Sequence, residues 1–191
     1  MDTNSETQRR QSNLLRIGTV AELDLAAARV RVESGDVLTD WLPWLVPHAG
    51  AGRVEWSAPS LGEQVLVLCV EGDAEAGIVL RGLYSDAVPA PAAAASLHQV
   101  RFSDGAVVEY DTEYHALTAS LPCGGRALIS ADAGVVINGP LTVNGDSTLN
   151  GAVDCSATVT AQTDVIGSGI SLKGHTHGGV QSGGAQTGAP Q

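Results

Sequence analysis

The fold of this chain is indicated most clearly by one segment, Val135-Val136-Ile137-Asn138-Gly139-Pro140-Leu141-Thr142-Val143-Asn144-Gly145. Its Asn-Gly corner at 138–139 recurs at 144–145, and a third corner follows at the same interval, at 150–151. Asn-Gly favours tight turns, and the aliphatic residues between the corners favour extended backbone. Regular corners separated by short apolar segments are typical of a β-solenoid or an intertwined β-helix.

The sequence around this stretch has the same texture. Short strands are expected at 126–130, 134–138, 141–144, 152–156 and 158–161, each broken by Gly, Asn, Asp or Pro. From His115 to the C-terminus there is no Phe, Trp or Tyr, so Val, Ile, Leu, Ala and Thr must supply the core. A single copy would be marginally stable, which predicts self-association.

The part of the chain before His115 has longer strands and all the aromatic residues. Five strand-like runs are separated by turn signals such as Ser34-Gly35-Asp36, at 16–25, 28–33, 37–42, 64–70 and 76–83. The three Trp lie between Trp41 and Trp56. This pattern predicts a small Greek-key barrel of the OB type. The Ala- and Pro-rich segment 87–96 reads as a linker, and three further strands are expected at 98–102, 106–111 and 116–121. The predicted fold class is all-β.

The charge balance limits the partners. Lys and Arg total 10 against 21 Asp and Glu, which gives a net charge of -11 and disfavours binding to nucleic acid or to an anionic membrane. The chain shows neither a signal-peptide pattern nor an apolar run of about 20 residues, so we expect it to be made in a reducing cytoplasm and to stay soluble. The three cysteines form no CxxC pair and are expected to be free, small and buried.

His175-Thr176-His177 is the strongest candidate metal site. On an extended strand, residues i and i+2 point to the same face, so both imidazoles can face one ion. Two ligands are too few for a closed site, and the simplest source of the others is further copies of the chain. Taken alone, the pattern fits a solvent-exposed pair equally well. The remaining histidines are read as packing or surface residues: His48, His98 and His115.

Aspartates recur along the C-terminal part, at Asp132, Asp146, Asp154 and Asp164. Carboxylates repeated around a three-fold axis could hold calcium, but turn chemistry explains them as well, and only Asp164 is retained as a candidate ion ligand. The sequence contains no nucleophile elbow, P-loop or HExxH motif. The tryptophans could form a base-stacking platform, but the region lacks a basic groove, so core or intersubunit packing is the preferred interpretation.

Taken together, these motifs resemble the central spike of contractile-tail particles, the baseplate assembly protein V family of tailed phages and R-type bacteriocins. The resemblance covers nearly the whole chain and departs mainly in a short shaft. It rests on five stretches: Thr39-Asp40-Trp41-Leu42-Pro43-Trp44-Leu45, the run 58–68 (APSLGEQVLVL), Gly82-Leu83-Tyr84-Ser85, the run 101–107 (RFSDGAV), and the ending His175-Thr176-His177 with Ser182-Gly183-Gly184 and Thr187-Gly188.

The resemblance implies a homotrimer with an N-terminal arm (1–15), an OB-fold domain (16–88), a linker (89–96), a triple-stranded β-helix shaft (97–166) and an apex (167–191). It implies one structural Fe(II) per trimer, held by His175 and His177 of each chain. Six imidazole nitrogens suit an octahedral ion such as Fe(II), Ni(II) or Co(II) better than zinc, and the family suggests iron. Ca2+ and Cl- on the trimer axis are further candidates.

The implied function is a non-enzymatic spike that caps the tail tube and punctures the bacterial outer membrane when the sheath contracts. Its partners would be the baseplate hub and tail tube proteins, with no nucleic acid. It would be assembled in the bacterial cytoplasm and carried at the baseplate tip of a virion or phage-tail-like particle. Two alternatives remain at this point: a metal-dependent enzyme using the histidine pair, which needs an open coordination position, and an OB-type nucleic-acid binder, which needs salt-sensitive binding to single strands.

Overall fold

The structure is a computed structural model that describes Gln11, residues 13–176, Gly179 and Gly183. The chain divides into two compact units, residues 1–128 and residues 129–191, and each is described by itself. The expected N-terminal arm lies largely outside the described residues.

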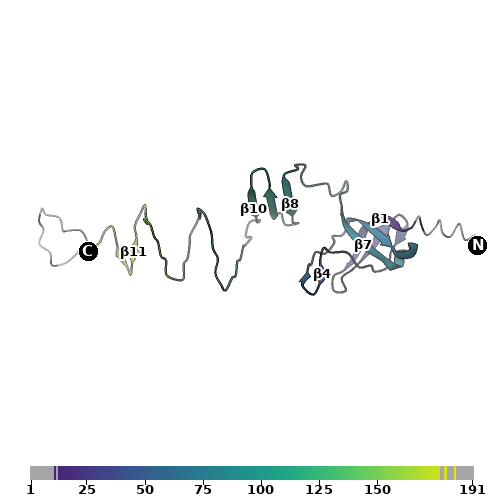
Figure 1. The fold of residues 1–191 in the computed structure, drawn as a ribbon, viewed down its shortest axis with the longest axis horizontal. Helices are drawn as coiled ribbons and strands as arrows, with labels where there is room; N and C mark the ends of the chain where they lie inside the picture. Colours follow the sequence, from purple (N-terminus) through teal and green to yellow (C-terminus); the bar gives the residue numbers. More distant parts are fainter. Residues whose placement is uncertain (1–10, 12, 177–178, 180–182, 184–191) are drawn as a thin grey trace, which may run out of the picture. The chain divides into compact units, whose positions relative to one another are not determined.

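The first unit contains a five-stranded antiparallel sheet in the order β3-β2-β1-β6-β7 (Figure 1). Its strands are β1 Leu15–Asp24, β2 Arg29–Ser34, β3 Val37–Leu38, β6 Gln64–Cys69 and β7 Gly77–Leu83. The first half of β1 pairs with β6 and the second half with β2, with a register shift between Val20 and Glu22. Such a bulge bends a strand, which lets β1 serve both neighbours.

The segment after β3 closes this sheet into a barrel. Leu42 bridges to Val30 on β2, and two residues later Trp44 bridges to Val79 on β7. The backbone N–H of Val79 donates to Pro43 O at 2.9 Å, and the N–H of Leu45 donates to Val79 O at 2.9 Å. Strand β2, which lies beside the short edge strand β3, is therefore joined to the opposite edge strand β7 through residues 42–45, as the expected barrel requires.

The interior of the barrel follows from the alternation of its strands. In β6 the side chains alternate between half-buried and buried, because successive residues point to opposite faces. The buried apolar cluster consists of Val20, Val30, Val32, Leu42, Val65, Val67, Cys69 and Val79. Gly18 is required beside it, because a Cβ there would lie 2.4 Å from Glu33 O. One chain therefore supplies the core of the barrel.

The remaining elements of the barrel region are short. They are the hairpin of β4 Ala49–Gly50 and β5 Arg53–Val54, and two 3-10 turns at Val70–Gly72 and Ala74–Ala76. The sequence pattern did not predict this hairpin. No helix among the described residues has the length and apolar character needed to cross a bilayer.

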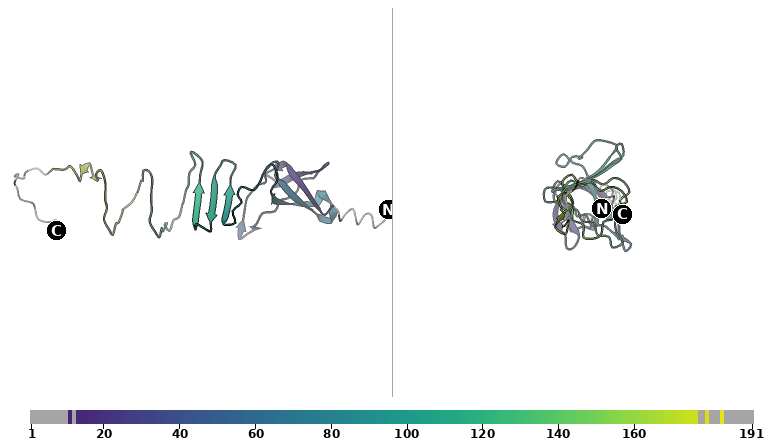
Figure 2. Two further views of the ribbon diagram at one scale, coloured as in Figure 1. Left: turned by 90° about the horizontal axis from the view of Figure 1, so that it is seen from above. Right: turned by 90° about the vertical axis from the view of Figure 1, so that its left-hand side faces the viewer.

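A separate antiparallel sheet follows in the same unit, with β8 Leu97–Arg101, β9 Val107–Asp111 and β10 Ala116–Ser120 (Figure 2). The cross-strand pairs Val100–Val108 and Tyr110–Leu117 lie on the same face, since alternate residues share a face. Their side chains are 41–75% exposed in the single chain. The three-stranded sheet thus presents an apolar face to solvent.

Residues 121–165, all of which the structure describes, contain no strand within the single chain. The five short strands expected between 126 and 161 therefore form no ladder of their own; the segment is drawn without arrows in Figure 1. Its aliphatic side chains are largely exposed, reaching 83% at Val136. The expectation for the cysteines was partly wrong: all three are free, but only Cys69 is buried, whereas Cys123 and Cys155 are exposed. Cys123 and Cys155 are exposed for the same reason as the aliphatic side chains of residues 121–165: nothing in the single chain packs against this segment.

Candidate metal centre

A two-stranded hairpin stands just before the histidine motif. Strands β11 Ile166–Gly167 and β12 Ile170–Ser171 pair in the register Ile166–Ser171 and Gly167–Ile170. The two residues at the turn have positive φ, +49° at Ser168 and +83° at Gly169. A two-residue hairpin turn of this kind needs positive φ at both positions, and Gly adopts it without a steric cost. The turn brings the residues before β11 beside those after β12.

Asp164 closes the base of this hairpin. Its Oδ1 accepts the backbone N–H of Val165 at 2.8 Å and that of Lys173 at 3.1 Å. The hydroxyl of Ser171, more than the backbone N–H groups around it, lowers the pKa of the Asp164 carboxyl below its ordinary value. The proposed ion ligand of the shaft is thus occupied with hydrogen bonds to its own chain, which favours the turn interpretation of this aspartate.

Ser171 is also the residue that contacts His175. Its carbonyl oxygen accepts the backbone N–H of His175 at 3.1 Å and lies 3.0 Å from Nδ1 of the imidazole. A carbonyl can only accept, so Nδ1 carries the proton and, in the neutral ring, Nε2 carries the lone pair. Metal-bound histidines commonly donate their second ring N–H to a carbonyl in this way. The chemistry at His175 therefore fits a metal ligand that binds through Nε2.

The second histidine of the motif, His177, lies outside the described residues. Among the residues that the structure does describe, no three His, Cys, Asp or Glu side chains converge on a common point. His48 lies 2.8 Å from a Glu55 oxygen, and His98 and His115 are exposed and distant in sequence from the motif. One chain thus brings no complete ligand set together in its described part.

Comparison with known proteins identifies the chain. Residues 16–84 match the Type VI secretion system/phage-baseplate injector OB domain, and residues 169–191 match the GpV Apex motif. The chain is also 36% identical, over 203 aligned residues, to the spike protein of Escherichia phage P2, and the alignment covers 97% of this chain and 96% of that protein. The chain belongs to the phage spike family.

Membership of the spike family confirms several expectations. The barrel is an OB domain, the fold is all-β, and the histidine motif lies in the family's apex motif. Spike and baseplate proteins are structural components of the tail, so the chain has a baseplate role and is not an enzyme. The metal-dependent enzyme considered above is thereby set aside.

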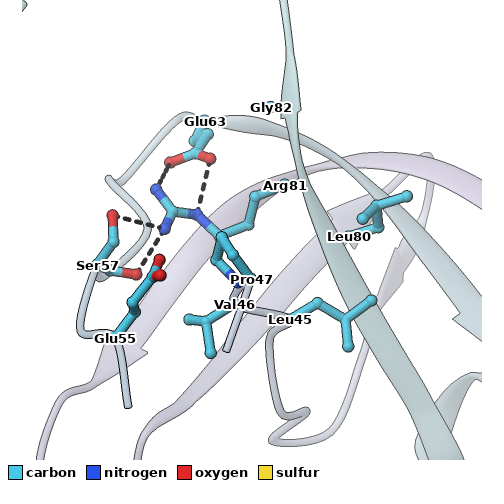
Figure 3. Close-up of a pocket in the computed structure, with 9 residues that line it drawn as sticks. All are labelled: Leu45, Val46, Pro47, Glu55, Ser57, Glu63, Leu80, Arg81 and Gly82. Atoms are coloured by element: carbon cyan, nitrogen blue, oxygen red, sulfur yellow. Dashed lines mark hydrogen bonds and ion pairs between the residues drawn. The ribbon is translucent and has the colours of Figure 1, made fainter. Parts of the chain in front are cut away.

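The OB domain of the spike carries a hollow with a volume of about 630 Å3. Figure 3 shows Arg81 within it, where the guanidinium forms a two-pronged ion pair with Glu63 and also donates to Ser57. Glu55 lines the same hollow. Two carboxylates accompany a single guanidinium that is already paired, so this surface does not favour a phosphate backbone.

The tryptophans of the OB domain pack within the chain. Trp44 lies against the buried core, and its ring meets that of Trp56 edge to face, with centroids 5.6 Å apart. The Arg31 guanidinium lies 5.9 Å from the ring centre of Trp41. The packing interpretation is thus confirmed for Trp44, while Trp56 remains 63% exposed.

Sequence reasoning missed Ser171. No motif singles it out, and it stands four residues before His175 in an ordinary strand pattern. The available signal was local: a Ser and an Asp flanking a Ser-Gly turn are residues that hydrogen-bond nearby backbone.

Proposed function

We propose that three copies of this chain form a homotrimeric spike that caps the tail tube and punctures the bacterial outer membrane when the sheath contracts. The baseplate role comes with the family; the trimer, the metal tip and the puncture are the proposal. Three features of the chain support it, one from each part of its C-terminal half.

The first feature is residues 129–165, whose apolar side chains have nothing to cover them in one chain. Leu141 and Val143 alternate with Thr142 and Asn144, so extended backbone places the two aliphatic side chains on one side. Both aliphatic side chains are more than half exposed, at 68% and 57%. Further on, strict alternation places four small apolar residues on one side and four polar ones on the other: Val153, Cys155, Ala157 and Val159 against Asp154, Ser156, Thr158 and Thr160.

Such alternation is typical of a strand with one buried face. Because the segment pairs with nothing in its own chain, the partners must come from other chains. Two further copies, wound around a common axis, would supply the missing backbone hydrogen bonds and cover the apolar side.

The second feature is the uncovered face of the three-stranded sheet. Val100, Val108, Tyr110 and Leu117 form an apolar patch on it. Three such sheets facing a common axis would bury this patch in the same way as the segment that follows.

The third feature is the histidine motif. Three-fold symmetry multiplies the two imidazoles of each chain into six nitrogens, an octahedral set that suits Fe(II). His175 and His177 would hold this ion, which would serve to tie the three C-terminal ends together. All positions would be filled by protein, so the role is structural.

Puncture requires a stiff shaft that does not adhere to the envelope. Residues 129–165 contain four Asp and neither Lys nor Arg, so little in this segment attracts anionic lipid headgroups. Strands shared among three chains cannot separate one at a time, which makes the shaft resistant to force and to SDS.

The trimer and its metal are tested together by native mass spectrometry and elemental analysis of the purified full-length chain. We expect a mass three times the 19.5 kDa of one chain and one iron per three chains. A monomer, or one metal per chain, would contradict the proposal. The variant His177→Ala should lose the metal and keep the tryptophan fluorescence of the folded barrel; full metal retention would overturn the six-histidine centre.

Puncture is tested on particles assembled with the wild-type spike or with His175→Ala/His177→Ala. At equal adsorption to cells, we expect wild-type particles to admit a fluorescent dye through the outer membrane on contraction, and variant particles to admit less. Equal dye entry would show that the metal tip is dispensable for penetration. Absence of dye entry with wild-type particles would refute puncture itself.

A further inference from the structure

We propose that Asp164 and Ser171 are positioning residues that orient the His175 imidazole for metal binding before any metal arrives. The role in metal binding rests on the proposed metal tip, whereas the contacts among these residues do not depend on it. It assigns a role to the hairpin of β11 and β12, whose second strand lies within the apex motif.

The first step is the link between Asp164 and Ser171. The carboxylate accepts the N–H of Lys173, which lies two residues beyond Ser171 on the opposite side of the hairpin. It also accepts the N–H of its own neighbour, Val165. One side chain thereby holds together the two ends of the hairpin, in which Ser171 pairs with Ile166.

The second step runs from Ser171 to the histidine. The serine Oγ accepts the N–H of Gly174 at 2.8 Å, and its carbonyl oxygen accepts both the backbone N–H and the ring Nδ1–H of His175. Ser171 is half-buried, whereas Leu172, Lys173 and Gly174 are exposed. A single residue therefore constrains the turn 171–175 at three points.

The consequence concerns the protonation and orientation of the ring. A proton held on Nδ1 by the Ser171 carbonyl leaves the lone pair on Nε2, the nitrogen farther from the backbone. The hydrogen bond also limits rotation of the ring, so less conformational entropy remains to be lost when a metal binds. Asp164, which the sequence offered as an ion ligand, would serve the metal indirectly through Ser171.

The geometry is tested on the metal-free full-length protein by 15N NMR with histidine-selective labelling. The chain has five histidines, so the His175 signals can be assigned from the His175→Gln variant. We expect wild-type His175 to hold its proton on Nδ1, and Ser171→Ala and Asp164→Ala to shift it towards the Nε2-protonated form common in free histidine. Ser171→Thr, which keeps the hydroxyl, should restore the wild-type form.

The matched control is Asp154→Ala, which removes an exposed aspartate elsewhere in the same unit. If it changes the His175 signals as much as Asp164→Ala does, the effect is one of net charge and the positioning role is refuted. A wild-type protein with Nε2 protonated would refute it as well.

The consequence for the metal is tested by the rate at which a chelator removes iron from the loaded trimer. Mutation of the groups that hydrogen-bond to ligating histidines typically lowers metal affinity 10- to 100-fold. We therefore expect the chelator to remove iron about 10-fold faster or more from Ser171→Ala, and at nearly the wild-type rate from Ser171→Thr. Unchanged release in Ser171→Ala would overturn the positioning role. A wild-type protein that holds no metal would refute the proposed tip, while the NMR measurement would still decide the geometry.

Discussion

The OB barrel and residues 129–165 contain similar apolar residues, but only the barrel buries them within one chain. In the barrel, β1 pairs with two neighbours, and eight buried side chains form a core within one chain. In residues 129–165 the strand-like segments pair with nothing in their own chain, and the aliphatic side chains stay exposed. A sequence can therefore specify a β-strand even when the neighbouring strand that pairs with it belongs to another chain.

The largest expected effect comes from placing a charge on the apolar side of the second region. In Val143→Asp, three carboxylates would face a common axis, and an uncompensated buried charge costs about 3–5 kcal/mol. We expect loss of the trimer, measured by light scattering. Thr142→Asp is the matched control, because its neighbouring position lies on the polar side and should leave the trimer intact. Equal behaviour of the two variants would refute the shared core.

A core deletion in the barrel should act within one chain. Leu42 is 1% exposed and sits on the segment that closes the barrel. Leu42→Ala should cost the OB domain about 2–5 kcal/mol of unfolding free energy. All three tryptophans lie in this domain, so fluorescence during denaturant unfolding follows it selectively. The oligomeric mass should not change; dissociation of the trimer would show that the two regions fold as one.

Acid should affect the hairpin at the apex only at low pH. The pKa of Asp164 is lowered in the folded protein, chiefly by the Ser171 hydroxyl, so its stabilising contribution is present above the ordinary carboxyl pKa and is lost as pH falls through the lowered value. In metal-free protein the amide shift of Lys173 should therefore move only below about pH 4. A shift that moves at higher pH would contradict the hydrogen bond to Asp164.

The smallest effects are expected from ion pairs on the barrel surface. Glu22 and Arg31 lie 3.1 Å apart with side chains 46% and 29% exposed, so Glu22→Gln should change stability by less than about 1 kcal/mol. Glu63→Gln should cost more, because Glu63 holds both prongs of Arg81 and accepts the N–H of Ser60. If both variants lose the same unfolding free energy in urea, the exposure of an ion pair does not determine its contribution to stability.

Alternation was enough to predict the longer strands of the barrel and of the three-stranded sheet from sequence. Thr39 shows where it was not enough. The strand expected at 37–42 ends at Leu38, because the Thr39 hydroxyl, rather than a backbone carbonyl, accepts the N–H of Val32 at 2.9 Å. The hairpin of β4 and β5 escaped notice because strands of two residues carry no period.

At the apex, the histidine motif was evident from sequence, whereas its supporting contacts were not. Asp164 and Ser171 meet only because a turn with two positive φ values reverses the chain between them. Spacing alone does not encode that reversal, since Ser-Gly is common in loops of many kinds. The sequence also could not predict that residues 121–165 form no strand pairs within the chain, because an alternating strand pattern is the same whichever chain supplies the neighbouring strand.

Lys173 gives the apex a chemical handle. It is the sole lysine of the chain; its backbone N–H is held by Asp164, while the residue itself is exposed. An amine-reactive dye or gold cluster would therefore attach, apart from the chain's N-terminus, only beside the histidine motif. The position of the tip could then be followed during contraction by fluorescence or electron microscopy, without introducing any substitution.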